Sequence, residues 1–137
     1  MRLNIVTPEK KIFEDEVDSV SLPTLEGEIT VLPHHVPLMT QIKPGELTIR
    51  AHGKDDHFVT GGGFVEITGS RVSVLTDLAE TSDQISIEKA EEAKKRAEEA
   101  IKSKHNLSDE EVAVAMATLE KALASINIKR RHHPKSL

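Results

Sequence analysis

Residues that break helices are confined to one part of the sequence. All seven glycines lie at or before Gly69, and five of the six prolines lie at or before Pro44, whereas the next helix breaker is Pro134. Because Gly and Pro interrupt helices and mark turns, this distribution predicts a turn-rich β domain over residues 1–84 and a helical domain over residues 85–137. The charge changes at the same boundary, from seven basic and fourteen acidic residues to eleven basic and nine acidic.

Short runs of alternating apolar and polar residues recur between the turn signals of the first domain. Their spacing is typical of a β-sandwich, and we expect about ten strands. Nine runs are found at residues 2–6, 11–13, 17–22, 28–32, 37–42, 46–50, 57–60, 64–68 and 72–76. Gly69 and Ser70, between the last two runs, predict a hairpin with a two-residue loop.

The second domain is expected to contain two antiparallel helices, over about residues 86–104 and from Ser108 to about Ile128. Ser108 and Glu111 have the spacing of a capping box at the start of the second helix. Each helix carries one apolar face at the spacing i, i+3, i+4. The faces consist of Ile87, Ala90, Ala93, Ala97, Ala100 and Ile101, and of Val112, Ala115, Met116, Leu119, Ala122, Leu123 and Ile126. The fold class predicted for the whole chain is therefore α+β, a β-sandwich followed by a two-helix hairpin.

The apolar face of the first helix is mainly alanine. An alanine side chain buries three fewer carbons than leucine, a difference of roughly 2 kcal/mol at about 0.8 kcal/mol per buried methylene. We therefore expect a weakly held hairpin whose helices can move, since mobile elements come from the least stable parts of a structure. A hairpin that is thin but does not move is the alternative.

Composition excludes several classes of function. The chain has no cysteine, which rules out disulfides, thiolate zinc sites, iron–sulfur clusters and cysteine nucleophiles. It is net acidic and has three Phe but no Tyr or Trp, so nucleic acid is not expected as a partner. No apolar run approaches the roughly 18 residues of a membrane span. We expect no signal peptide and a cytoplasmic location.

Candidate catalytic and metal sites are weak. Residues 61–63 are all glycine, but the Lys-Ser/Thr of a phosphate-binding loop is missing and a strand follows. A tight turn into that strand is the better interpretation. His34-His35 and His132-His133 are adjacent pairs, which match poorly the spaced ligands of a structural zinc site. We expect no catalytic residue, no metal and no cofactor, and a binding or structural module rather than an enzyme.

Five segments together resemble the epsilon subunits of bacterial F-type ATP synthases. They are EGEITVLPHHVPLMT at 26–40, IKPGEL at 42–47, VTGGGFVE at 59–66, VSVLTDLAE at 72–80 and EEAKKRAEE at 91–99. Their order and spacing cover nearly the whole chain. The family often has Gly where this chain has Thr30 and His34, so the local backbone is expected to differ at these two positions.

The resemblance implies a flattened β-sandwich at the foot of the rotating central stalk. Such a subunit performs no chemistry itself and couples proton flow in the membrane sector to ATP synthesis in the catalytic head. It would bind the gamma subunit and the ring of c subunits, and would meet the cytoplasmic face of the membrane only through the complex. The residues implied at these interfaces are Glu28 towards the c-ring, and His35, Pro37 and Thr40 along the gamma subunit.

In this family the helical hairpin either folds against the sandwich or extends into the head, where it blocks ATP hydrolysis. The resemblance implies that Lys129, Arg130 and Arg131 contact the alpha and beta catalytic subunits in the extended state. A solvated tail, whose cations are favourable near a helix C-terminus, is the alternative.

Some members of the family bind ATP through an Ile-Asp-x-x-Arg-Ala motif and a downstream arginine. Ile85, Ala90 and Arg96 match those positions, but Ser86 replaces the Asp and Lys89 replaces the Arg. Because Lys cannot make the planar bidentate contacts of Arg, we expect ATP to bind weakly or not at all.

The residues alone leave a second class of function open. A free-standing β-sandwich adaptor with a helical dimerisation hairpin would have the same pattern of strands and helices. Copurification from membranes distinguishes the two, because the adaptor would be isolated as a homodimer without gamma and c subunits.

Overall fold

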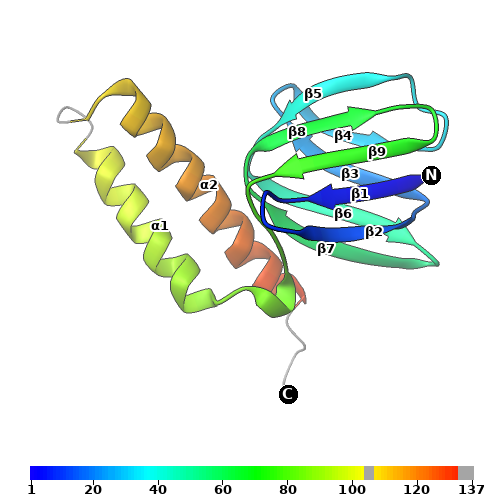
Figure 1. Cartoon of the computed structure of the whole chain (residues 1–137). Coiled ribbons are helices and arrows are strands. Elements are labelled where there is room, and N and C mark those ends of the chain that lie inside the picture. Colours follow the sequence, from blue (N-terminus) through cyan, green and yellow to red (C-terminus); the bar gives the residue numbers. More distant parts are fainter. Residues whose placement is uncertain (104–106, 133–137) are drawn as a thin grey trace, which may run out of the picture.

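The computed structural model describes residues 1–103 and 107–132. Within these residues the chain forms ten strands, a short 3-10 helix (η1) and two α-helices (Figure 1). The strands are β1 (Arg2–Val6), β2 (Lys11–Glu16), β3 (Ser19–Thr24), β4 (Gly27–Val31), β5 (Leu38–Ile42), β6 (Gly45–Ala51), β7 (Lys54–Thr60), β8 (Gly63–Ile67), β9 (Arg71–Thr76) and β10 (Ala79–Thr81). They are followed by η1 (Ser82–Gln84), α1 (Ile87–Lys102) and α2 (Asp109–His132). The predicted order is confirmed, and only β10 has no predicted counterpart because three residues are too few to show alternation.

The strands form two layers around one apolar core. One layer contains β10, β7, β6, β3 and β4, and the other contains β5, β8, β9, β1 and β2. The layers join where Thr24 of β3 pairs with Ile42 of β5. At the opposite edge Phe13 of β2 meets Phe58 of β7 edge to face, with ring centroids 6.0 Å apart. Apolar side chains from both layers are buried between them, which confirms the predicted β-sandwich.

The loop between β8 and β9 has the predicted length. The Thr68 amide donates to the Arg71 carbonyl at 2.8 Å, which leaves Gly69 and Ser70 as a two-residue loop. This loop sets the register in which the two strands pair.

The β6–β7 hairpin is longer than the alternation of residues predicts. Its turn is made by His52 and Gly53, whose φ angles are 54° and 75°, and β7 already begins at Lys54. The positive φ angles give the turn the same twist as the flanking strands, so the strands stay paired up to the turn. Lys54, Asp55 and Asp56, which do not alternate with apolar residues, therefore pair with β6 as well. Across this hairpin the Arg50 Nε donates to Asp55 at 3.0 Å, and this hydrogen bond lowers the pKa of Asp55.

The three glycines at 61–63 allow two strands and a loop to approach closely. The Thr76 hydroxyl donates to the Gly62 carbonyl at 3.1 Å. Gly63 begins β8, and a Cβ added there would lie 1.9 Å from the Leu75 carbonyl oxygen. The predicted tight turn into a strand is confirmed, and the close approach of Leu75 explains why Gly63 carries no side chain.

Both helices begin at capped serines. The Ser108 hydroxyl accepts from the Glu111 amide and the Glu111 carboxylate accepts from the Ser108 amide, each at 3.1 Å, which confirms the predicted capping box. Ser86 precedes α1, and its hydroxyl accepts from the Lys89 amide at 3.3 Å. The expected turn at 105–107 lies mostly outside the described residues, which omit 104–106.

The interior of the hairpin is mainly alanine, as predicted, but the buried face of α2 differs from the prediction. Met116 and Leu123 were expected to be buried and are 50% and 40% exposed. The reason is that α2 packs against α1 on one side and against the sandwich on another, so one stripe does not describe its burial. The buried residues are Ala90 and Ala97 of α1 and Ala115, Ala122, Ser125, Ile126 and Ile128 of α2. The helix also continues to His132 instead of ending near Ile128, because Lys and Arg are good helix formers.

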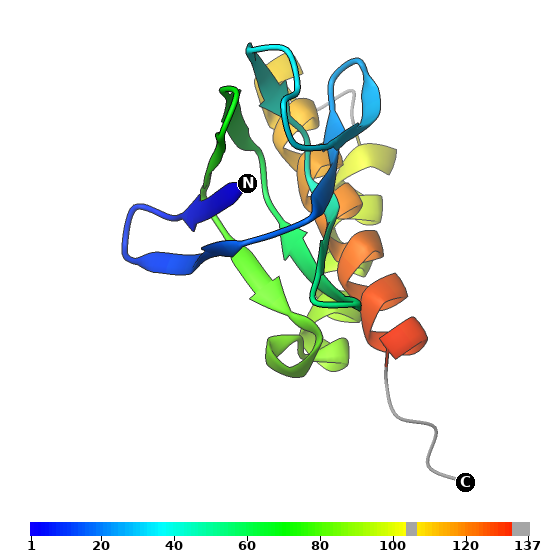
Figure 2. The same ribbon diagram turned by 90° about the vertical axis from the view of Figure 1, so that its right-hand side faces the viewer.

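The hairpin is folded against the sandwich. Figure 1 shows α2 between α1 and the sandwich, and Figure 2 shows both helices along one side of it. α2 packs against β6, β7 and η1, and α1 packs against α2. Neither helix, over the residues described, is long and apolar enough to cross a membrane.

The close approach at Gly63 predicts that a side chain at this position destabilises the sandwich. Gly63→Ala should lower the free energy of unfolding by about 1–3 kcal/mol or more, because the methyl group would overlap the Leu75 carbonyl. Urea denaturation of the full chain, followed by circular dichroism, measures the change. Gly69→Ala is the matched control, since a Cβ at Gly69 meets no atom within 4 Å. Equal losses for the two variants would contradict the explanation.

Candidate functional site

Large apolar side chains lie on the outside of the sandwich. Phe64 of β8 and Leu75 of β9 pair directly and are 54% and 55% exposed. Met39 is 66% exposed and lies on the same side of the sheet, because it is two residues from Gln41, which pairs with Phe64. We call Met39, Phe64 and Leu75 the outer apolar face. Exposed clusters of this kind mark interaction sites.

The outer apolar face was not predicted, although the sequence contains a signal for it. In β8 the buried residues are Val65 and Ile67, and in β9 they are Val72 and Val74. Their alternation leaves the intervening positions for solvent-facing residues. Phe64 and Leu75 occupy such positions and are apolar.

The residues expected at the c-ring and gamma interfaces are only partly brought together. Glu28 of β4 and Pro37 are exposed, and His35 is half-buried. Their segments, blue to cyan in Figures 1 and 2, lie at the end of the sandwich opposite the C-terminal end of α2. Thr40 differs, because it pairs with the fully buried Val65 and is itself half-buried on the core side of β5.

His34 and Thr30, the two positions where glycine was expected from the resemblance, differ in backbone conformation. His34 has a φ of 67°, in the left-handed region that favours glycine. The turn is therefore made here by a residue other than glycine. Thr30 lies in the extended strand β4, and its hydroxyl is 2.9 Å from that of Ser21 on β3.

A small apolar cluster joins the hairpin to the sandwich. Ile128 of α2 is fully buried against Val59 of β7 and Ile85, which precedes α1, and Ala124 packs beside them. We call these four residues the junction. Fully burying an aliphatic side chain contributes about 1.5–3 kcal/mol, so the three buried side chains of the junction contribute much less than the fifteen buried residues of the sandwich core.

The three cations near the C-terminus each have a partner in the folded hairpin. Lys129 Nζ donates to the Ser82 carbonyl of η1 at 3.0 Å. Arg130 lies 3.6 Å from the Glu91 carboxylate of α1. Arg131 forms an ion pair with Glu46 of β6. The sequence predicted no partner for these residues within the chain itself.

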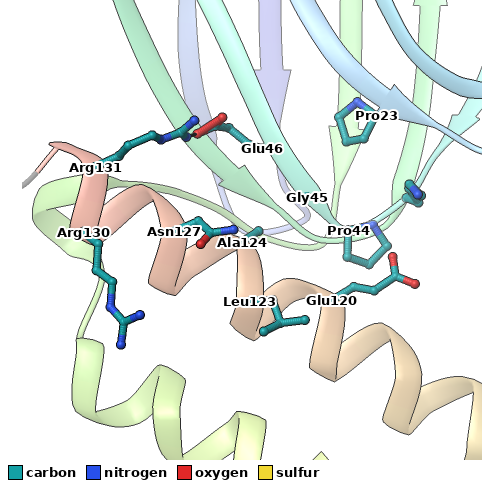
Figure 3. A pocket seen from close by; sticks show the side chains of 11 residues that line it. Pro23, Pro44, Gly45, Glu46, Glu120, Leu123, Ala124, Asn127, Arg130 and Arg131 are labelled. Carbon is teal, nitrogen blue, oxygen red and sulfur yellow. Dashed lines mark hydrogen bonds and ion pairs between the residues drawn. The ribbon is translucent and has the colours of Figure 1, made fainter.

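An open groove of about 790 Å³ runs between the sandwich and α2 (Figure 3). Pro23 and Pro44 line it on the sandwich side, and Leu123 and Ala124 line it on α2. In Figure 3 Arg131 reaches across to Glu46, whereas Arg130 points away from the sandwich, toward α1. The groove is thus bridged at one end by a charged pair.

The positions matched to the ATP motif are separated in space. Ile85 and Ala90 line a cavity of about 280 Å³ between η1 and the two helices, together with Ser86 and Lys89. Arg96 instead lines a second groove near the start of α2 and pairs with Glu92 at 3.2 Å. The cavity is slightly smaller than the 300–1,000 Å³ typical of small-molecule sites.

The residues described contain no group of three or more His, Cys, Asp or Glu side chains that could hold a metal ion. The side chain of His34 is exposed. His133 and the side chain of His132 lie outside what the structure describes.

Two family descriptions match the chain in succession. The ATP synthase delta/epsilon chain β-sandwich domain matches residues 1–82, and the ATP synthase delta/epsilon chain long α-helix domain matches residues 83–129. Both parts of the fold are therefore found in the same family and in the same order.

Known proteins resemble the chain over nearly its full length. The ATP synthase epsilon chain of Dehalococcoides mccartyi is 42% identical over 98% of this chain and 96% of its own length. The epsilon chain of Desulforamulus reducens is 45% identical over 91% of this chain and 93% of its own. A chain from the Euglena gracilis mitochondrial ATP synthase, in a structure of OSCP, F1 and c-ring, aligns with a TM-score of 0.76 at 26% identity, over 89% of this chain and 76% of that one. The resemblance noted in the sequence is confirmed: the chain belongs to the delta/epsilon chain family of ATP synthase.

Proposed function

We propose that the β-sandwich, residues 1–84, binds the rotor of an F-type ATP synthase and that the hairpin, residues 85–137, regulates ATP hydrolysis. Membership of the family makes the chain a non-catalytic central-stalk subunit of ATP synthase. The observation that carries the proposed division of roles is the small junction between two separately packed parts. One part can stay attached while the other moves.

The outer apolar face is the surface we assign to the gamma subunit. Its three side chains are more than half exposed and adjacent on one sheet, and burying them would stabilise a protein interface. Glu28 of β4 lies at the end of the sandwich away from the C-terminal end of α2, and we assign that end to the c-ring. His35 and Pro37, which the resemblance implies along gamma, are assigned to the gamma subunit together with the outer apolar face. Thr40, also implied along gamma, is half-buried on the core side of β5 and therefore offers less surface for contact.

The hairpin is folded here, and the proposed inhibitory state is the extended one. In that state Lys129 and Arg131 would leave their partners Ser82 and Glu46, and the three cations would bind acidic groups of the alpha and beta subunits. Only a difference in interaction between the two states shifts an equilibrium. The effect of each cation on hydrolysis is therefore the difference between its folded and extended contacts.

ATP is not expected to stabilise the folded hairpin strongly. Arg96 lies in another groove than Ile85 and Ala90, and Lys89 lacks the bidentate geometry of Arg. The location that fits this function is the peripheral sector of the complex at the cytoplasmic face of a bacterial membrane, which the chain would meet only through its partners.

Removing the hairpin tests the regulatory role. The assembled complex with a chain truncated after residue 84 should hydrolyse ATP severalfold faster than the complex with the full chain, because the inhibitory element is missing. Steady-state ATPase assays on purified complexes measure this, with immunoblotting to confirm that the truncated subunit is present. Equal rates with a fully occupied truncated subunit would contradict the role.

Replacing the outer apolar face tests the gamma interface. The double variant Phe64→Ser and Leu75→Ser should weaken binding of the gamma subunit by at least about 3 kcal/mol, since each side chain contributes about 1.5–3 kcal/mol when buried. Copurification with gamma is the measurement. Thermal unfolding of the isolated variant should be nearly unchanged, because both side chains are exposed.

A pair of methionines supplies the matched control. Met39→Ser lies on the outer apolar face and should reduce copurification, whereas Met116→Ser on α2 makes the same change at an exposed position elsewhere. Stoichiometric gamma with the double variant, or equal losses for the two methionine variants, would show that the interface is elsewhere.

A further inference from the structure

Glu46 is the acidic group on the sandwich that meets the basic end of α2. It lies in β6, with its side chain 24% exposed, and forms an ion pair with Arg131, 85 residues further along the chain. The His57 Nδ1 of β7 lies 3.8 Å from the same carboxylate. Figure 3 shows the Arg131 side chain extending from α2 to Glu46 at one end of the groove.

The three cations differ in what happens to their partners when the hairpin moves. Glu91, which pairs with Arg130, belongs to the hairpin and can move with it. Ser82, which accepts from Lys129, lies in η1 between the two domains. Glu46 belongs to the sandwich, so its pair with Arg131 must break when α2 leaves the sandwich.

Glu46 therefore stabilises the folded state of the hairpin and has no effect on the extended state. Arg131 can interact in the folded state through Glu46 and in the extended state through the catalytic head. Glu46 remains on β6, within the part proposed to stay on the rotor, and cannot follow α2. A substitution at Glu46 changes the free energy of the folded state and leaves the contacts of the extended state intact.

We propose that Glu46 is a regulatory residue that keeps the hairpin folded through Arg131 and thereby opposes inhibition of ATP hydrolysis. The inference deepens the proposed function and depends on it for the effect on hydrolysis, but the folded position of the hairpin can be tested in the isolated chain. Loss of the carboxylate should increase the ratio of undocked to docked hairpin about two- to fivefold, the range given by a partly exposed ion pair.

The first experiment measures docking directly. The chain has no cysteine, so nitroxide labels can be attached at Lys43→Cys and Leu123→Cys, two positions that line the groove from opposite sides. Pulsed electron paramagnetic resonance measures the distance between the two labels, and a larger fraction of Glu46→Gln molecules than of parent molecules should show a long distance. Glu120→Gln is the matched control, because it removes a carboxylate from the same groove without removing the pair with Arg131.

Exchanging the charges of Glu46 and Arg131 distinguishes loss of the ion pair from a general effect of Glu46 on folding. Glu46→Arg should undock the hairpin further, and adding Arg131→Glu to it should restore the docked population. An unchanged distance distribution in Glu46→Gln, or no restoration by the exchanged pair, would overturn the role of Glu46.

The second experiment uses the assembled complex. Glu46→Gln should lower ATP hydrolysis about two- to fivefold, as expected for a partly exposed ion pair, because more hairpins reach the inhibitory position. If the labels report undocking and hydrolysis is unchanged, the Glu46–Arg131 pair holds the hairpin but hairpin position does not regulate the enzyme. That result would overturn the proposed function, whereas unchanged docking would overturn only the inference about Glu46.

Discussion

The position of the hairpin depends on the burial of Ile128. This side chain is fully buried against Val59 of the sandwich and Ile85 of the connecting segment, with Ala124 beside it. The sandwich has its own, much larger core formed by both of its layers. The junction therefore fixes the folded position of the hairpin with far fewer buried side chains than hold the sandwich together.

The hairpin itself is suited to leaving the folded position. Its interior consists mainly of alanine side chains, which bury little area, while the capping box at Ser108 and the capping hydroxyl of Ser86 stabilise each helix locally. Because the packing between the helices and against the sandwich buries few large side chains, little burial is lost when they separate. Of the cations at the end of α2, Arg130 pairs within the hairpin, whereas Arg131, through Glu46, reaches the sandwich directly and adds an interaction specific to the folded state.

Much of the fold could be predicted from the sequence. The division into strands and helices follows from the placement of glycine and proline, and the capping box and the Gly69-Ser70 loop follow from local chemistry alone. The buried face of α2 was partly wrong, since Met116 and Leu123 are exposed, because a helix with two neighbours has two buried faces and the pattern describes one. The partners of Lys129, Arg130 and Arg131 depend on contacts between distant parts of the chain, which no local pattern contains. Phe64 and Leu75 could have been found, because they are apolar at positions where the alternation calls for solvent-facing residues.

The most direct test of the account is hydrogen exchange on the full chain with Ile128→Ala. Removing this side chain should weaken the junction by about 2–5 kcal/mol. Exchange at the amides of α2 should then accelerate at least about thirtyfold, as 1.4 kcal/mol corresponds to a factor of ten, while the amides of the sandwich core exchange as in the parent. Equal acceleration in α2 and in the strands would show that the chain unfolds as a single unit and would contradict a sandwich that stays in place while its hairpin moves.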